Sequence, residues 1–317
     1  MPLKKGIMKT FILHSLATVI LAVSFGSSAR AALPKVVTTT EDLAALVRDI
    51  GGDKVTVDTM ARGYQDPHFV EPKPSFIVKL HGADLLVVIG RELELGWLPP
   101  LLTQSRNAKI QPGGPGYLDA SIGVRILDIP TGQLTRAMGD VHPSGNPHYW
   151  LDPDNGRIMA KSIAAALARI APADRPYFDQ RYADFDRRLG EAQKRWTTAM
   201  SAYKGTKVVT YHRSWPNFTE RFGLEVIGYV EPKPGIPPSP SHTIQLIAEM
   251  KRQQVKVILV EPYFDLKTPD SIARAVGGKV LVLTPSVGGV KEAPDYIALF
   301  DYNINLLAST FKQMPGR

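Results

Sequence analysis

Three histidines stand where imidazole side chains could bind a metal ion. Two of them follow a proline, in Asp66-Pro67-His68 and Asn146-Pro147-His148, and the third is His212, just after a strand-like run. Proline fixes its own φ angle and holds the preceding residue extended, so the backbone before His68 and His148 is stiff. Three imidazoles suit Zn²⁺ and similar ions and leave a fourth position for an oxygen donor or water. The pattern indicates a metal site built from distant parts of the chain.

The remaining sequence offers few competing sites. His142 shares a Pro-, Gly- and Asn-rich loop with His148 and is a candidate auxiliary ligand, although we expect it to face solvent. The sequence contains no His-Glu-x-x-His helix, no Gly-x-Ser-x-Gly elbow and no Walker-type phosphate loop. These absences favour metal binding over enzymatic activity.

The elements that must position these histidines alternate between strand and helix in both halves. We expect strands over residues 35–40, 54–60, 83–89, 124–129, 207–211, 225–230, 255–260 and 279–283, and helices over residues 41–50, 75–80, 97–104, 155–170, 174–200, 215–222, 243–253, 271–276 and 296–311. Such alternation predicts an α/β fold with mostly parallel sheets. Ligands bind beyond the carboxyl ends of parallel strands, and we place all three histidines at that edge.

The predicted domain organisation has two lobes. Residues 32–172 would form the N-terminal α/β lobe, residues 202–317 the C-terminal one, and residues 173–201 a single long connecting helix. A helix of this length would extend about 40 Å, enough to run beside both lobes. The metal site would then lie in the cleft between them.

The N-terminus has the pattern of an export signal. Lys4, Lys5 and Lys9 precede an apolar stretch, and Ala29-Arg30-Ala31 supplies small residues at the two positions that a signal peptidase reads. We predict a signal peptide over residues 1–31 with cleavage after Ala31, and a periplasmic protein. A membrane anchor is the less favoured alternative, because the apolar run is short for a membrane span.

The composition indicates a globular protein that neither binds nucleic acid nor contains disulfides. The 317 residues are 44% hydrophobic and 21% charged, which is typical of a globular protein. The formal net charge of the whole chain is +8, and residues 1–31 contribute four basic and no acidic side chains, so residues 32–317 carry +4. The sequence has no run of basic residues of the kind typical of nucleic-acid binding. The absence of cysteine excludes disulfides and thiolate ligands, and it predicts that no lipid anchor is attached.

Combined motifs resemble a known family. They are Asp66-Pro67-His68 followed by Lys73-Pro74-Ser75, Ala83-Asp84-Leu85 with Gly90 and Glu94, Asn146-Pro147-His148-Tyr149-Trp150-Leu151-Asp152-Pro153, Tyr211-His212-Arg213-Ser214-Trp215-Pro216-Asn217-Phe218, Gly228-Tyr229-Val230-Glu231-Pro232, and Pro240-Ser241. Together they are similar to the metal-binding solute receptors of bacterial zinc and manganese ABC importers (cluster A-I). The resemblance covers essentially the whole chain after residue 31.

The resemblance implies two α/β lobes joined by one long helix, metal in the cleft, and an inner-membrane ABC permease as partner. It makes His68, His148 and His212 the metal ligands of a monomeric receptor that is not an enzyme. Manganese-type members use a carboxylate at the position of His212, so three imidazoles favour Zn²⁺. A receptor for manganese or another divalent metal is the main alternative.

The chain also departs from the family pattern. The family usually places an aspartate ligand in a Leu-Asp-Pro stretch, where this chain has Leu283-Thr284-Pro285. Glu261 is our candidate for the fourth ligand, with water or a purely structural Glu261 as alternatives. Glu261 could also act as general base in a secreted zinc hydrolase, the least favoured interpretation. The long His- and acid-rich loop of many zinc receptors is absent.

Overall fold

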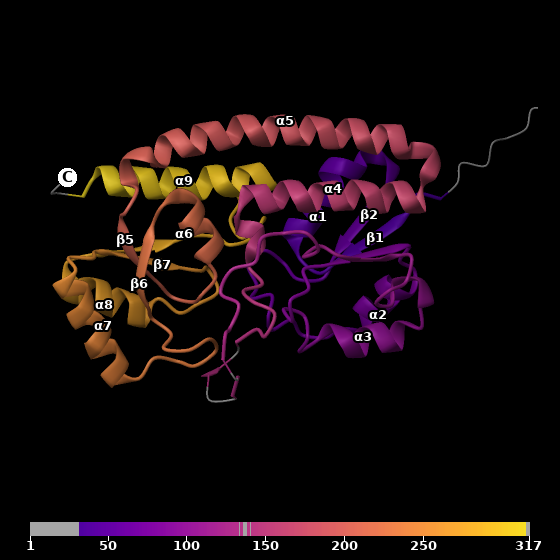
Figure 1. The fold of residues 1–317 in the computed structure, drawn as a ribbon. Coiled ribbons are helices and arrows are strands. Elements are labelled where there is room, and N and C mark those ends of the chain that lie inside the picture. The colour runs from indigo at the N-terminus through magenta and orange to yellow at the C-terminus, as the bar shows by residue number, and fades with distance from the viewer. Residues whose placement is uncertain (1–31, 133, 136–137, 140, 315–317) are drawn as a thin grey trace, which may run out of the picture. The chain divides into compact units, whose positions relative to one another are not determined.

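The computed structural model describes residues 32–132, 134–135, 138–139 and 141–314 (Figure 1). Chain contacts divide the sequence into residues 1–32 and residues 33–317, and the second unit carries the fold. The predicted signal peptide, residues 1–31, lies outside the described residues. Within the described part of the chain, no helix combines the length and apolar character needed to cross a membrane.

The first half contains a parallel four-stranded sheet with strand order β2-β1-β3-β4. Its strands are β1 (Lys35–Thr38), β2 (Thr56–Thr59), β3 (Leu85–Val88) and β4 (Tyr117–Asp119). Every residue of β3 is buried, which explains why this strand is apolar throughout. The edge strands β2 and β4 are only partly buried and have mixed sequences.

The second half repeats this topology. A parallel sheet of strand order β6-β5-β7-β8 is formed by β5 (Lys207–Thr210), β6 (Glu225–Tyr229), β7 (Val257–Val260) and β8 (Lys279–Val282). In both sheets the first strand in sequence lies between the second and the third. The predicted fold class, two mostly parallel α/β lobes with a long helix, is confirmed.

The helices match the expected alternation. They are α1 (Glu41–Gly51), α2 (Pro74–His81), α3 (Leu98–Ser105), α4 (Pro153–Ile170), α5 (Arg175–Met200), α6 (Pro216–Phe222), α7 (Pro240–Arg252), α8 (Lys267–Val276) and α9 (Tyr296–Lys312). Short 3₁₀ helices span Gly52–Lys54, Ala108–Ile110, Tyr149–Leu151, Pro172–Asp174 and Ser201–Tyr203. Several helices begin at a side-chain cap, because Thr40, Asp152 and Asp295 each accept a backbone N–H of the first turn.

The long helix α5 connects the two halves. It packs against α1 and α4 of the first half and against α9 of the second, as Figure 1 shows. Its buried side chains, among them Phe185 and Trp196, belong to one hydrophobic core that includes residues of both halves, and Trp196 stacks on Phe300 of α9. Smaller cores lie under α2 and α3 and under α7 and α8. The lobe boundaries at residues 172 and 202 stay predictions.

Two expectations need correction. Residues 124–129 do not form a strand, and the fourth strand of the first sheet is instead Tyr117–Asp119. The strand is anchored at both ends by backbone bonds, Leu86 N–H to the Gly116 carbonyl and Ala120 N–H to the Val88 carbonyl. A half-buried strand of three residues has no apolar run, so the sequence pattern predicted the strand in the wrong segment.

Helix α2 also differs from the expectation. It begins at Pro74, one residue before the expected Ser75, and no side chain caps its N-terminus.

Candidate metal centre

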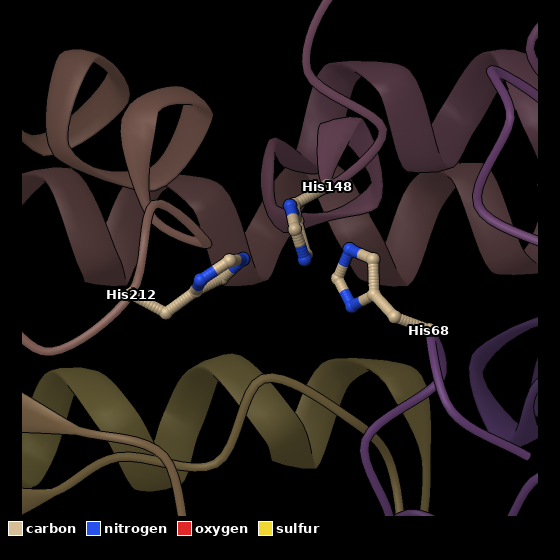
Figure 2. Close-up of side chains that lie close together, drawn as sticks. All are labelled: His68, His148 and His212. Carbon is tan, nitrogen blue, oxygen red and sulfur yellow. The ribbon is translucent and has the colours of Figure 1, made fainter. Parts of the chain in front are cut away.

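The three predicted histidines meet at one point. Within the described residues, His68, His148 and His212 form a group whose possible ligand atoms all lie within 4.8 Å of one another. Their ring centroids are separated by 5.1 Å, 5.4 Å and 5.5 Å. Figure 2 shows the three imidazoles turned toward a common centre. All three side chains are buried.

The two Asx-Pro-His tripeptides fix their histidines in the same way. The Asp66 side chain accepts the backbone N–H of His68 at 3.0 Å and lies 2.8 Å from its Nδ1. Asn146 does the same for His148, at 3.0 Å and 2.9 Å. Each Nδ1 therefore donates a proton to an oxygen, and Nε2 presents its lone pair to the centre. The two prolines are evident from the sequence, whereas this role of Asp66 and Asn146 is evident only from the structure.

His212 is held by a different partner. It lies two residues beyond β5, and its Nδ1 is 2.7 Å from Oε2 of the buried Glu231. Glu231 follows β6, which pairs with β5, and its N–H donates to the Tyr211 carbonyl at 3.0 Å. Sheet pairing thus places this carboxylate beside His212. Glu231 was missed as a site residue, although its position in the Gly228–Pro232 motif was visible.

The electrostatics of the three imidazoles differ. Burial, followed by the charges of His68 and His212, holds the pKa of His148 well below its usual value. Burial also acts to lower the pKa of His212, but the hydrogen bond to Glu231 and nearby carboxylate charges outweigh it and raise that pKa. A metal ion would bind His148 as a neutral base and would displace a proton from His212 when that ring is charged.

Glu261 does not join this group. Its carboxylate is fully buried, and Oε1 accepts the indole N–H of Trp215 at 2.9 Å. Burial raises the pKa of Glu261, while the nearby charge of His212 acts in the opposite direction. Thr284 is also outside the group, and its hydroxyl donates to the Ser286 carbonyl at 2.8 Å. The structure therefore brings together three of the four predicted ligands.

His142 lies beside the centre rather than in solvent. Its side chain is half-buried, and its ring centroid is 5.3 Å from that of His68. It lines a cavity of about 360 Å³ together with His148 and His212, and a second cavity of about 710 Å³ together with His68. The expectation that His142 faces solvent is wrong, because its ring lies beside that of His68 and lines both cavities.

The loop that carries His142 and His148 is anchored to the end of β3. The Ser144 hydroxyl donates to Glu92 at 2.7 Å, and the Arg91 guanidinium donates to the Ser144 carbonyl at 3.4 Å. Gly90, Arg91 and Glu92 all have positive φ angles, and the side chains of Arg91 and Glu92 reach Ser144 of the loop from this turn. His148 thus reaches the site from a loop, as expected, but the strand predicted before that loop, residues 124–129, is not formed.

Comparison with known proteins agrees with this geometry. Residues 36–310 match the model of a family described as zinc-uptake complex component A, periplasmic. The chain belongs to this family. It is a metal ABC transporter substrate-binding protein, of a family of receptors that deliver metal ions to a membrane permease and are not enzymes.

Relatives of the zinc-uptake component A family include proteins named for two metals. The manganese ABC transporter substrate-binding lipoprotein PsaA of Streptococcus pneumoniae is 25% identical over 299 residues, which covers 91% of this chain and 93% of the relative. The high-affinity zinc uptake system protein ZnuA of Bacillus subtilis (strain 168) is also 25% identical, with 86% of each chain covered. These relatives place the family's receptors outside the cytoplasm and leave the metal open.

Solved structures of the family share the fold. A ZnuA deletion mutant with zinc bound matches with a TM-score of 0.75 and 25% identity, covering 90% of this chain and 100% of that one. A manganese-bound periplasmic metal-binding protein from candidatus liberibacter asiaticus matches with a TM-score of 0.72 and 19% identity, covering 87% and 99%. The two-lobe architecture is therefore common to structures bound to either metal.

Proposed function

We propose that this receptor captures Zn²⁺ between His68, His148 and His212 in the periplasm and delivers it to an inner-membrane ABC permease. The observation that carries the proposal is the donor set, three imidazoles whose Nδ1 atoms are each held by an oxygen of a neighbouring side chain. Neutral imidazoles oriented in this way are the ligands that zinc takes in sites with three histidines.

The chemistry of these donors favours zinc over manganese. Manganese prefers carboxylate, carbonyl and water oxygens, whereas imidazole nitrogen suits zinc, copper, iron and nickel. No carboxylate belongs to the group formed by the three histidines among the described residues. A manganese receptor, the alternative, would need oxygen ligands from elsewhere in the chain or from water.

Two carboxylates support a divalent cation without touching it. Asp66 and Glu231 each bind an Nδ1 atom, and together they could balance the double charge of the ion across the imidazole rings. Asn146 performs the same orienting task without a charge. A site with three neutral ligands and two carboxylates behind them is close to electroneutral with zinc bound, which lowers the cost of burying the cation.

Several narrower expectations remain predictions. Glu261 as the fourth ligand would use Oε2, because Oε1 accepts the Trp215 indole N–H. The carboxylate lies outside the histidine group, which gives no support to Glu261 as general base in a zinc hydrolase. Cleavage of the export signal after Ala31, the absence of a lipid anchor and a monomeric state are predictions from the sequence alone.

The proposal can be tested by calorimetry on metal-stripped protein. We expect tight 1:1 binding of Zn²⁺ at neutral pH, weaker binding of Mn²⁺, and loss of zinc binding in His148→Ala. His81→Ala is the matched control, because His81 is exposed at the end of α2 and its Nδ1 contacts the Ser105 carbonyl. Absence of zinc binding, tighter binding of manganese, or unchanged affinity in His148→Ala would each refute the assignment.

A further inference from the structure

Three imidazoles leave one position of a tetrahedral zinc site to be filled. Glu261 is the candidate that the sequence suggests for that position, and it lies outside the histidine group. Its Oε1 accepts the Trp215 indole N–H at 2.9 Å, and its Oε2 has no hydrogen-bond partner among the described residues. The Thr284 hydroxyl, where the family has an aspartate, donates to the Ser286 carbonyl at 2.8 Å. Water and other side chains near the histidines are therefore further candidates for the fourth ligand.

His142 lies next to one of the three grouped histidines, His68. The distance from its ring centroid to that of His68 is 5.3 Å, and the distances among the three grouped rings are 5.1 Å to 5.5 Å. His142 is also the one histidine that lines both cavities described above, of which one contains His148 and His212 and the other contains His68. His142 therefore lies between two cavities that are each lined by at least one of the grouped histidines.

The backbone around His142 is anchored beside the site. The Gly145 N–H donates to the His142 carbonyl at 3.1 Å and closes a tight turn, in which Gly145 has a φ angle of 97°. Within this turn Ser144 is fixed by Glu92, and beyond it the Asn146 N–H donates to the Leu127 carbonyl at 2.9 Å. These bonds hold the backbone of His142 close to that of His148.

We propose that His142 supplies the fourth ligand and completes a site of four imidazoles. The inference rests on the proposed function and adds a residue to it. In the described structure the His142 nitrogens lie outside the group within 4.8 Å, so the ring turns toward the ion when the metal binds. Because the ring also forms the boundary between the two cavities, the same turn would close the centre over the bound ion.

A fourth nitrogen donor would increase the preference of the receptor for zinc over manganese. Replacing an oxygen ligand by an imidazole disfavours manganese further, whereas zinc accepts four nitrogen donors in a tetrahedral arrangement. The chain lacks the aspartate expected at Thr284, and His142 would compensate for its absence. The receptor would then discriminate between zinc and manganese through the loop that carries His142.

X-ray absorption at the zinc edge tests the proposal directly, because multiple scattering counts imidazole ligands. We expect four imidazoles in the zinc-loaded protein, and three plus one oxygen in His142→Ala. Zinc affinity in His142→Ala should fall at least about tenfold, since even changes behind the first ligands reach that size. Manganese affinity should fall less, so the ratio of zinc to manganese affinity should decrease.

Two further variants separate the possible outcomes. His81→Ala controls for loss of a histidine away from the site, and Glu261→Gln tests the competing ligand. Three imidazoles plus an oxygen in the unaltered protein, with His142→Ala unchanged in affinity, would overturn the inference while leaving the proposed function intact. Failure of the unaltered protein to bind zinc would refute the proposed function itself. A metal-free thermal melt of His142→Ala checks that the variant is folded.

Discussion

Glu231→Gln offers a test of how the site stabilises a divalent ion. The Glu231 carboxylate is buried and contacts the Nδ1 of His212 at 2.7 Å. The glutamine amide has the same shape, and its oxygen can still accept the Nδ1 proton. The substitution therefore removes one negative charge but keeps the hydrogen bond that orients the ring.

The magnitude follows from this geometry. The contact of 2.7 Å, the width of the imidazole and a zinc–nitrogen bond of about 2.0 Å place the carboxylate about 6.5 Å from the ion. At an effective dielectric constant of about 20, a charge of −1 and a charge of +2 at that distance attract by about 5 kcal/mol. Glu231→Gln also avoids burying a carboxylate in the metal-free protein, which offsets part of this term. We expect a net loss of about 1.4–2.7 kcal/mol, or 10- to 100-fold in zinc affinity.

Competition titration with a zinc chelator of known affinity measures this loss. Glu225→Gln is the matched control, since Glu225 begins the same strand β6 but is exposed, and its affinity should equal that of the unaltered protein. Unchanged affinity in Glu231→Gln would refute the idea that this carboxylate stabilises the ion through His212. A loss of more than about 1000-fold would indicate that Glu231 binds the metal directly, because effects through a neighbouring ligand are smaller.

Two other predictions concern stability. Asn146→Asp should lower the metal-free unfolding free energy by about 1–3 kcal/mol, because the Asn146 amide donates to the Arg213 carbonyl at 2.8 Å and a carboxylate cannot. Asp66→Asn, which keeps both acceptor contacts to His68, is the control, and equal melting of the two variants would contradict the argument. Burial raises the pKa of Glu94 from 4.5 to about 7, so protonated Glu94 stabilises the fold fully below pH 4.5 and this contribution is lost as the pH rises through 7. Denaturant unfolding of the unaltered protein and of Glu94→Gln measures this contribution. Between pH 4.5 and pH 7 the unfolding free energy of the unaltered protein should fall by roughly 3 kcal/mol relative to that of the variant. A difference in unfolding free energy that does not change with pH would contradict the assignment.

Local patterns were sufficient for most of the fold. The continuous apolar run at Leu85–Val88 and the periodicity of residues 174–200 each depend on neighbours in sequence, and each matched an observed element. The strand Tyr117–Asp119 was missed because its place is set by pairing with β3, some thirty residues earlier, and not by its own composition. A short edge strand shows little sequence preference of its own, because its residues are selected by contacts with the neighbouring strand.

The sequence by itself determined which residue types could bind the metal, and the stiff prolines before His68 and His148 were sufficient to single them out. Only the tertiary structure decided what surrounds them. Glu231 reaches His212 because two parallel strands pair. Oε1 of Glu261, just after β7, accepts the indole N–H of Trp215, just before α6. Contacts between residues separated by tens of positions are fixed by packing and hydrogen bonding across the fold, which leave little trace in the local order of residues.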